Sequence, residues 1–149
     1  MITIKRTSSD DADFIQLVRS LDKELAQIDG EGHSFYAQFN KIDKIKHAVV
    51  VYADNQPIAC GAIKELEPGV MEVKRMYTEP AHRGKGAATQ GLHALEAWVA
   101  ELGYQKCRLE TGKRQPDAVA LYIKNGYHII PNYGQYAGVE NSVCFEKGL

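Results

Sequence analysis

The sequence predicts an α/β sandwich in which a mixed central sheet of about seven strands is flanked by about four helices. Two observations lead to this class. Segments with alternating apolar and polar residues are interspersed with segments whose apolar residues recur every three or four positions, in the order β-α-α-β-β-β-α-β-α-β-β. The 149 residues are 44% hydrophobic and 25% charged, which suits a single domain over residues 1–149 with a sizeable core.

The first 45 residues are expected to form one strand and two helices. Residues 2–6 alternate apolar and polar side chains, and Ser8-Ser9-Asp10 then offers a helix N-cap. The first helix has an apolar face that suits packing on a sheet, formed by Phe14, Leu17, Val18, Leu21 and Leu25. Glycines at positions 30 and 32 end this helix, and a second helical pattern follows with Phe35, Phe39, Ile42 and Ile45.

Three β-type segments follow one another closely in the middle of the chain. Residues 48–53 and 58–66 are separated by the turn cluster Asp54-Asn55-Gln56-Pro57, which predicts a hairpin. Glu67-Pro68-Gly69 forms the next turn, and residues 70–78 then return as a third antiparallel strand. This third strand leads directly into a glycine-rich turn.

A long amphipathic helix is expected after that turn. Its apolar stripe consists of Ala88, Leu92, Leu95, Val99 and Leu102. A short strand at 107–111 follows, and a further helix begins at Pro116 and stops at Asn125-Gly126. Two closing strands, 127–130 and 142–146, are joined by a loop that is rich in aromatic residues.

The overall charge gives no indication of a polyanionic partner. Because 18 basic and 19 acidic residues give a net charge of −1, neither nucleic acid nor an anionic membrane is expected as a partner. The N-terminus lacks the apolar core of a signal peptide, and no apolar run approaches the ~18 residues that a membrane span needs. A cytoplasmic protein without membrane contact is therefore expected.

Three cysteines, Cys60, Cys107 and Cys144, are widely separated, and each lies among apolar residues of an expected strand. No CxxC pair and no cluster of cysteine with histidine accompanies them, so buried free thiols are expected rather than a metal site. Their number and spacing suit a reducing cytoplasm.

The chain is organised around the turn Arg83-Gly84-Lys85-Gly86-Ala87-Ala88, between an expected strand and the long helix. Its two glycines let the backbone approach a ligand closely, and the helix offers unpaired N–H groups and the positive end of its dipole. Such a turn can hold a pyrophosphate, to which the side chains of Arg83 and Lys85 would add positive charge. The alternative is a strand-to-helix turn closed by glycines, with Arg83 in a salt bridge.

The spacing Arg83-x-x-Gly86-x-Ala88, entered from Met76-Tyr77-Thr78-Glu79-Pro80, resembles the acyl-coenzyme A signature of the GNAT N-acetyltransferase superfamily. The predicted element order is also that of the GNAT fold, and the resemblance covers essentially the whole chain, most specifically residues 71–127. It implies transfer of an acetyl group from acetyl-coenzyme A (acetyl-CoA) to an amine by direct attack, without a metal. Rival classes are transfer through a cysteine, an acyl-CoA sensor without turnover, and a binder of nucleic acid or phosphonucleotides.

The resemblance also implies which residues hold the coenzyme. In GNAT enzymes the strand before the turn is bulged and splayed from its parallel neighbour, so that its backbone pairs with the pantetheine arm. One amide of the bulge, here at Met76 or Tyr77, would face the acetyl carbonyl. The expected set is Met76, Tyr77, Thr78, Arg83, Gly84, Lys85, Gly86, Ala87, Ala88, Thr89 and Gln115, of which Gln115 replaces the asparagine usual in the family.

The catalytic candidates are one tyrosine and two glutamates. Tyr122 matches the tyrosine that many GNAT enzymes use as general acid, and a phenol with a pKa of about 10 stays protonated at neutral pH. The alternative is that Tyr122 only packs on its helix. Glu110 precedes Tyr122 by the spacing found in ribosomal-protein alanine acetyltransferases, whereas Glu72 lies on the cofactor strand. Either could be the base for the attacking amine, because strand alternation alone does not decide which points into the cleft.

Acceptor contacts are expected from two loops. His33 and Tyr36 lie near the junction of the first two helices, and Tyr133, Tyr136 and Glu140 lie on the late aromatic loop. Aromatic rings with a carboxylate suit an amine, although packing within the loops is the alternative for each residue. The expected acceptor is a small-molecule amine or an amino acid, with protein or peptide N-termini or lysines as the alternative. Many relatives pair through late strands, so a homodimer is one expected state.

Overall fold

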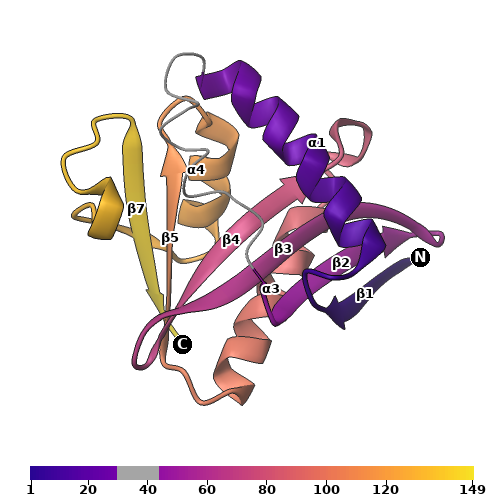
Figure 1. Ribbon diagram of the computed structural model, residues 1–149, viewed down its shortest axis with the longest axis horizontal. Helices are drawn as coiled ribbons and strands as arrows, with labels where there is room; N and C mark the ends of the chain where they lie inside the picture. Colours follow the sequence, from indigo (N-terminus) through magenta and orange to yellow (C-terminus); the bar gives the residue numbers. More distant parts are fainter. Residues whose placement is uncertain (30–43) are drawn as a thin grey trace.

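The computed structural model describes residues 1–29 and 44–149, and it contains one seven-stranded sheet. The predicted α/β class with a mixed sheet is confirmed. The expected second helix falls mainly on residues 30–43, outside the described residues, so the described part shows three α-helices. The elements (Figure 1) are β1 (Ile2–Thr7), α1 (Ala12–Asp29), β2 (His47–Ala53), β3 (Gln56–Glu67), β4 (Val70–Thr78), the short 3-10 helix η2 (Pro80–His82), α3 (Ala87–Glu101), β5 (Lys106–Gly112), α4 (Pro116–Lys124), β6 (His128–Ile130), the 3-10 helix η3 (Gly134–Tyr136) and β7 (Ser142–Gly148).

The strands are arranged in the order β1-β2-β3-β4-β5-β7-β6. Strands β1 to β4 form a continuous antiparallel meander, which confirms the predicted hairpin and third strand. Strand β5 then pairs with β4 in parallel, and β7 lies between β5 and β6, antiparallel to both. The change from antiparallel to parallel pairing therefore occurs at the centre of the sheet.

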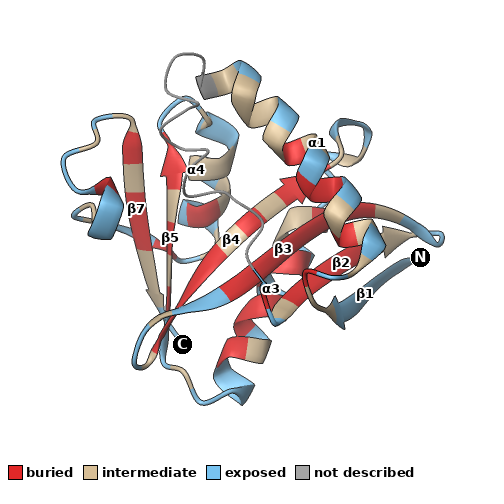
Figure 2. Ribbon diagram, in the orientation of Figure 1, coloured by how far each residue is buried: buried red, intermediate tan, exposed pale blue. Residues whose placement is uncertain are grey.

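Helices cover both faces of the sheet, with α1 on one face and α3 and α4 on the other (Figure 1). Strand β2 shows the reason, because Val50 packs with Phe14 of α1 whereas Val49 packs with Leu92 and Leu95 of α3. Successive residues of a strand point to opposite faces, so a strand covered on both sides is apolar throughout. Figure 2 shows the resulting buried segments along β2, β3 and β4.

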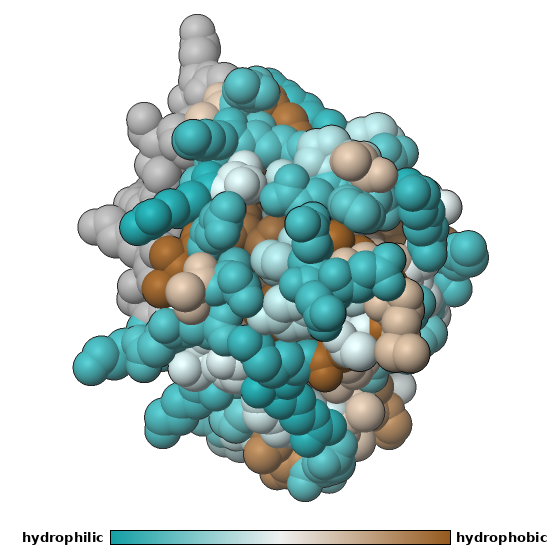
Figure 3. All heavy atoms as spheres, turned by 90° about the vertical axis from the view of Figure 1, so that its right-hand side faces the viewer, coloured by the Kyte–Doolittle hydropathy of each residue, from teal (hydrophilic) through white to brown (hydrophobic). Residues whose placement is uncertain are grey.

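Strand β1 forms one edge of the sheet and is exposed over most of its length. The side of the molecule in Figure 3 is mostly hydrophilic, with apolar residues in small scattered groups. On β1, Lys5 forms an ion pair with Asp11 at 2.7 Å. Charged side chains on an edge strand hinder pairing with another chain, so this edge is protected.

Strand β4 departs from regular geometry in its second half. Its register with β3 shifts between Cys60 and Ala62, because β4 carries an extra residue at this point. Within this bulge Arg75 adopts a φ of +60°, a left-handed backbone conformation that residues other than glycine rarely take. On the other side, β4 pairs with β5 only over Val70–Glu72, after which the two strands diverge (Figure 1). The bulged and splayed strand implied by the sequence resemblance is therefore confirmed.

Gly61 of β3 leaves room for the side chain of Met76 at the bulge. A Cβ atom built on Gly61 would lie 2.4 Å from the Sδ atom of Met76 and 2.9 Å from Cδ1 of Leu95. Leu95 is fully buried, so it has little space into which to move. The geometry of the bulge thus depends on a glycine in the neighbouring strand.

The substitution Gly61→Val is expected to destabilise the protein by about 1–3 kcal/mol, because the added methyl groups overpack the space that Met76 and Leu95 fill. Urea unfolding measures the change in free energy. The control is Gly61→Val combined with Met76→Ala, in which the truncated side chain should restore part of the loss. A Gly61→Val protein as stable as the wild type would contradict this account of the bulge.

Candidate active site

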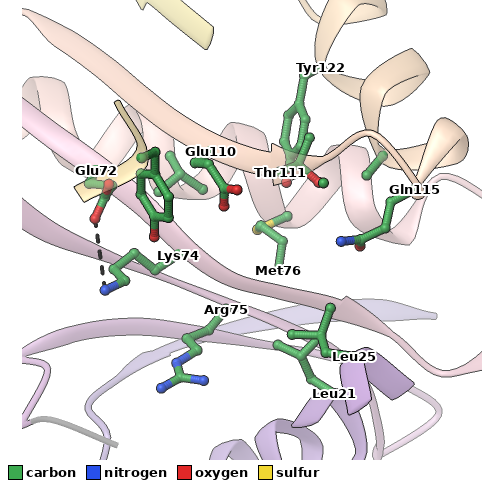
Figure 4. A pocket seen from close by; sticks show the side chains of 14 residues that line it. Leu21, Leu25, Glu72, Lys74, Arg75, Met76, Glu110, Thr111, Gln115 and Tyr122 are labelled. Carbon is green, nitrogen blue, oxygen red and sulfur yellow. Dashed lines mark ion pairs between the residues drawn. The ribbon is translucent and has the colours of Figure 1, made fainter. Parts of the chain in front are cut away.

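A pocket opens where β4 and β5 diverge, and α1, α4 and the β6–β7 loop complete its wall (Figure 4). Because these strands no longer pair beyond Glu72, side chains from several elements fill the space between them. The lining residues are Leu21, Leu25, Glu72, Val73, Lys74, Arg75, Met76, Glu110, Thr111, Gly112, Gln115, Ala118, Tyr122 and Tyr136.

Both candidate bases, Glu72 and Glu110, line this pocket (Figure 4). Val73 and Leu109, their neighbours on β4 and β5, pack in the core cluster beneath α3. Successive residues of a strand alternate between faces, so both carboxylates project to the opposite face. The alternation of side chains along a strand could not decide between the two candidate bases, because both point to the same face of the sheet.

Glu72 is held by two neighbouring side chains. Tyr133 Oη donates a hydrogen bond to Glu72 Oε2 at 2.5 Å, and Lys74 Nζ lies 3.8 Å from Glu72 Oε1 (dashed in Figure 4). Since Glu72 is only 7% exposed, its charge needs such partners. Burial, reinforced by the charge of Glu72, raises the pKa of Tyr133, so this phenol remains a donor. Glu72 therefore anchors the β6–β7 loop to β4.

Tyr122 reaches the pocket from the other face of the sheet, where its ring packs in the core beneath α3. The ring makes an edge contact with Tyr127, with centroids 5.7 Å apart, and a tilted contact with Phe145 at 6.0 Å. Burial, and to a lesser degree the negative charge of Glu110, raises the pKa of the Tyr122 phenol. The phenol thus stays protonated through neutral and alkaline pH, and Tyr122 both packs and lines the pocket.

The β6–β7 loop supplies an aromatic wall. Tyr136 is 5% exposed and lines the pocket, and its ring meets Tyr133 edge to face at 6.0 Å. Burial, followed by the charges of Glu110 and Glu72, raises the pKa of Tyr136. Both carboxylates therefore lie near this ring.

Of the expected acceptor residues, only Tyr136 lines the pocket in the part of the chain that the structure describes, and Tyr133 contacts two of the lining residues. Glu140 is exposed and does not line it, and His33 and Tyr36 lie outside the described residues. The sequence analysis missed the other lining residues. In a sequence, apolar residues of a helix look like residues of the hydrophobic core, and charged residues of a strand look like residues that face solvent. The missed residues are Leu21, Leu25, Val73, Lys74, Arg75, Thr111, Gly112 and Ala118.

The expected coenzyme residues of β4 and α4 occupy different environments. Met76 and Gln115 line the pocket, whereas Tyr77 packs in the cluster beneath α1. Thr78 is the last residue of β4 and is buried. Gln115 directly precedes α4, and its Nε2 atom lies 3.3 Å from a Cβ built on Gly112. Its amide group thus lies against the end of β5.

The glycine-rich turn leaves open space beside its backbone. Gly84 and Gly86 have φ values of +77° and +86°, and no described atom lies within 4 Å of a Cβ built on either residue. Gly86 is the N-cap of α3, and no described side chain caps this helix end. The first N–H groups of a helix have no acceptor within it, so they can bind an anion. With the exposed Lys85 nearby, the turn fits a pyrophosphate.

The side chain of Arg83, in contrast, is held by protein groups. Its Nε atom donates to the carbonyl oxygen of Thr78 at 2.9 Å, and its guanidinium pairs with Glu24 Oε1 at 2.7 Å. The guanidinium also lies 5.6 Å from the centroid of the Tyr77 ring. The salt bridge considered as an alternative for Arg83 is therefore present, together with the open turn.

The three cysteines are free and buried, as the sequence predicted. Burial raises the pKa of Cys60 to about 12 and that of Cys107 to about 11, and it also raises the pKa of Cys144. None of them lines the pocket between β4 and β5. The described residues contain no group of three side chains that could hold a metal ion, and no described helix is long and apolar enough to cross a membrane.

Comparison with known proteins adds independent information. The sequence model described as acetyltransferase (GNAT) family matches residues 15–127. The chain is 29% identical to an IAA acetyltransferase of Azospirillum brasilense, over 99% of this chain and 98% of that protein. It also resembles the solved structure of an acyl-CoA N-acyltransferase from Klebsiella pneumoniae, with 32% identity, a TM-score of 0.84 and coverage of 100% and 98%. A PaiA N-acetyltransferase of Thermoplasma acidophilum in complex with coenzyme A shares the fold, with 19% identity, a TM-score of 0.73 and coverage of 100% and 99%.

Proposed function

This chain belongs to the GNAT acetyltransferase family, and we propose that it transfers the acetyl group of acetyl-CoA to the primary amine of a small molecule or amino acid by direct attack. Acetyl-CoA is the acyl donor of this family, and proteins of this fold have been crystallised with coenzyme A and with acetyl-CoA. The observation that carries the proposal is the pocket between β4 and β5, which brings Glu110 and Tyr122 together beside the bulge.

The chain offers separate groups for each part of the coenzyme. When bound, acetyl-CoA supplies a thioester whose carbonyl carbon is open to attack. The turn from Gly84 to Ala88 offers N–H groups and the positive helix end to the pyrophosphate. The part of β4 that no longer pairs with β5 offers its backbone to the pantetheine arm, as a neighbouring strand would. An amide at Met76 or Tyr77 then donates to the carbonyl oxygen.

Glu110 is the better candidate for the base. The carboxylate of Glu72 already accepts a hydrogen bond from Tyr133 and pairs with Lys74, so a proton placed on it would weaken both interactions. Glu110 lies on the strand opposite the bulge, and its charge acts on Tyr122. It would take the proton of the acceptor's ammonium, directly or through a water molecule.

Tyr122 is the candidate acid for the leaving sulfur. Its raised pKa keeps the proton on the phenol at neutral pH, so Tyr122 can donate it as negative charge develops on the departing sulfur. The proton then passes from Tyr122 Oη to the sulfur, and the phenolate takes up the second proton, which the amine nitrogen loses after its attack. Direct attack is supported by the cysteines, because buried thiols with raised pKa values are poor nucleophiles.

The pocket wall supports a small amine as acceptor. The β6–β7 loop is folded on itself, since Asn132 Nδ2 donates to the carbonyl oxygen of Val139 at 3.1 Å, and it presents Tyr136 to the pocket. An ammonium group is attracted by aromatic faces and by carboxylates. These features suit a compact cationic acceptor that enters beside Glu110.

Calorimetric titration is expected to show micromolar affinity of the wild type for acetyl-CoA and for coenzyme A, and loss of most of it in Gly86→Asp. The new carboxylate would stand where the phosphates bind and would repel them. Gly103→Asp is the matched control, because Gly103 also has a positive φ and open space but lies beyond the other end of α3. Arg83→Ala is expected to weaken binding less, since Glu24 holds this side chain. A folded wild type that binds neither compound would contradict the proposal.

The substitution Tyr122→Phe is expected to lower kcat by roughly 10²- to 10⁴-fold, because it removes the acid while keeping the packed ring. The KM for acetyl-CoA should change little. Release of coenzyme A is followed with a thiol reagent while a panel of amino acids and primary alkylamines is screened. Tyr104→Phe is the control, since it removes a hydroxyl that donates to Glu65 at 2.6 Å away from the pocket. An unchanged kcat in Tyr122→Phe would exclude the acid role.

The pair Glu110→Gln and Glu72→Gln separates the two carboxylates. Glu110→Gln is expected to lower the rate at pH 7 by roughly 10²-fold or more, because the base is lost. Its rate should then rise with pH toward the pKa of the acceptor amine, since solvent deprotonates the amine instead. Glu72→Gln is expected to keep a higher kcat but to lower the unfolding temperature, because the buried ion pair between Glu72 and Lys74 is removed. The reverse order of kcat values would assign the base to Glu72.

A further inference from the structure

A buried polar cluster lies behind the pocket, on the face of the sheet that α3 and α4 cover. Glu96 in the middle of α3 is 7% exposed. Its Oε2 atom accepts a hydrogen bond from Tyr127 Oη at 2.8 Å, and its Oε1 atom pairs with Lys147 Nζ of β7 at 3.0 Å. The same ammonium lies 5.7 Å from the centroid of the Tyr127 ring. The proposed reaction makes no direct use of these three residues.

Tyr127 contacts Tyr122 in two ways. Its ring meets the Tyr122 ring edge to face, with centroids 5.7 Å apart and an interplanar angle of 68°. Its backbone N–H donates to the carbonyl oxygen of Tyr122 at 3.0 Å, at the C-terminal end of α4. The position of Tyr127 therefore limits both the backbone and the ring orientation of Tyr122, whose ring also contacts Phe145.

A buried charged cluster is not needed to fill this space. Well-packed apolar residues of similar volume are often as stabilising as a buried ion pair, because taking charges out of water is costly. What the cluster adds is a fixed orientation. The hydrogen bond to Glu96 holds the Tyr127 hydroxyl in one position, whereas an apolar ring could shift or tilt. The cluster also joins α3, whose N-terminus carries the glycine-rich turn, to the end of α4 and to β7.

We infer that Glu96 and Tyr127 are positioning residues for Tyr122, which hold its hydroxyl at the place where the leaving sulfur must be protonated. The inference rests on the proposed acid role of Tyr122. Proton transfer requires a donor within about 2.6–3.2 Å of its acceptor, so a small tilt of the Tyr122 ring would interrupt it. Lys147 balances the charge of Glu96 and lies over the face of the positioning ring.

The test uses Tyr127→Phe and Glu96→Gln, each alone and combined with Tyr122→Phe. The readout is release of coenzyme A from acetyl-CoA, with the most active amine of the panel or, if none is active, with water as acceptor. Each single variant is expected to lower kcat by roughly 10- to 100-fold, since small misplacements near the reacting atoms have effects of this size. The KM for acetyl-CoA should stay within about twofold, because the turn and β4 are not altered. In the Tyr122→Phe background neither substitution should lower kcat further.

The matched control is Tyr52→Phe, which also removes a hydroxyl that donates to a carboxylate, Asp13 Oδ2 at 2.6 Å, but packs against the α1 cluster. It should leave kcat unchanged. Thermal unfolding shows whether each variant is folded at the assay temperature. Tyr127→Phe leaves Glu96 paired with Lys147, so it keeps the test informative if Glu96→Gln unfolds.

Three results would overturn the inference. Normal kcat in Tyr127→Phe, while Tyr122→Phe is impaired, would show that the cluster only supports the fold. Equal losses with and without the Tyr122 hydroxyl would show that the cluster acts on another group. An unimpaired Tyr122→Phe would remove the acid role itself, and with it both the proposed mechanism and this inference, so the two failures are distinguishable.

Discussion

The interruption of the hydrogen-bond ladder between β4 and β5 is the constraint on which the site depends. Parallel strands at the centre of a sheet normally pair along their whole length with both faces covered. Here the pairing ends at Glu72 and Arg108, and the extra residue near Arg75 turns β4 away from its neighbour. Backbone groups of a central strand thus become available to a ligand, while the outer edges of the sheet are unaffected.

The same interruption lets side chains from opposite faces of the sheet meet. Glu72 and Glu110 belong to the face opposite α3, whereas the Tyr122 ring is packed in the core beneath that helix. A continuous sheet would separate these groups. Through the gap, a tyrosine with a rigidly packed ring can still line the pocket, so the proposed acid gains its orientation from the core rather than from a loop.

Ion pairs hold the remaining walls of the site. Asp22 and Glu24 of α1 pair with Arg75 at 3.2 Å and with Arg83 at 2.7 Å, which ties this helix to the bulge and to the glycine-rich turn. Lys74 and Tyr133 hold Glu72 in the same way on the other side. Arg75 and Glu72 are buried, so each charge needs its partner, and together these contacts fix the position of α1 and of the β6–β7 loop relative to β4.

The sequence by itself determined the local features of this protein. Gly84 and Gly86 predicted a turn open to an anion, Pro116 marked the start of α4, and the spacing of apolar residues gave the mixed α/β class. These features depend on residues a few positions apart, so a short stretch of chain specifies them. The family signature adds the coenzyme but not the acceptor.

Only the tertiary structure decided how distant residues combine. It showed that Glu72 and Glu110 lie on one face of the sheet and that Glu72 accepts a hydrogen bond from Tyr133. It also showed that Arg83 pairs with Glu24, 59 positions away. It also brought Glu96 to Tyr127 across the core. No local pattern encodes such partners, because they depend on the register of neighbouring strands and on how α1 and α3 cross the sheet. Periodicity assigns a residue to a face, and packing alone decides what it meets there.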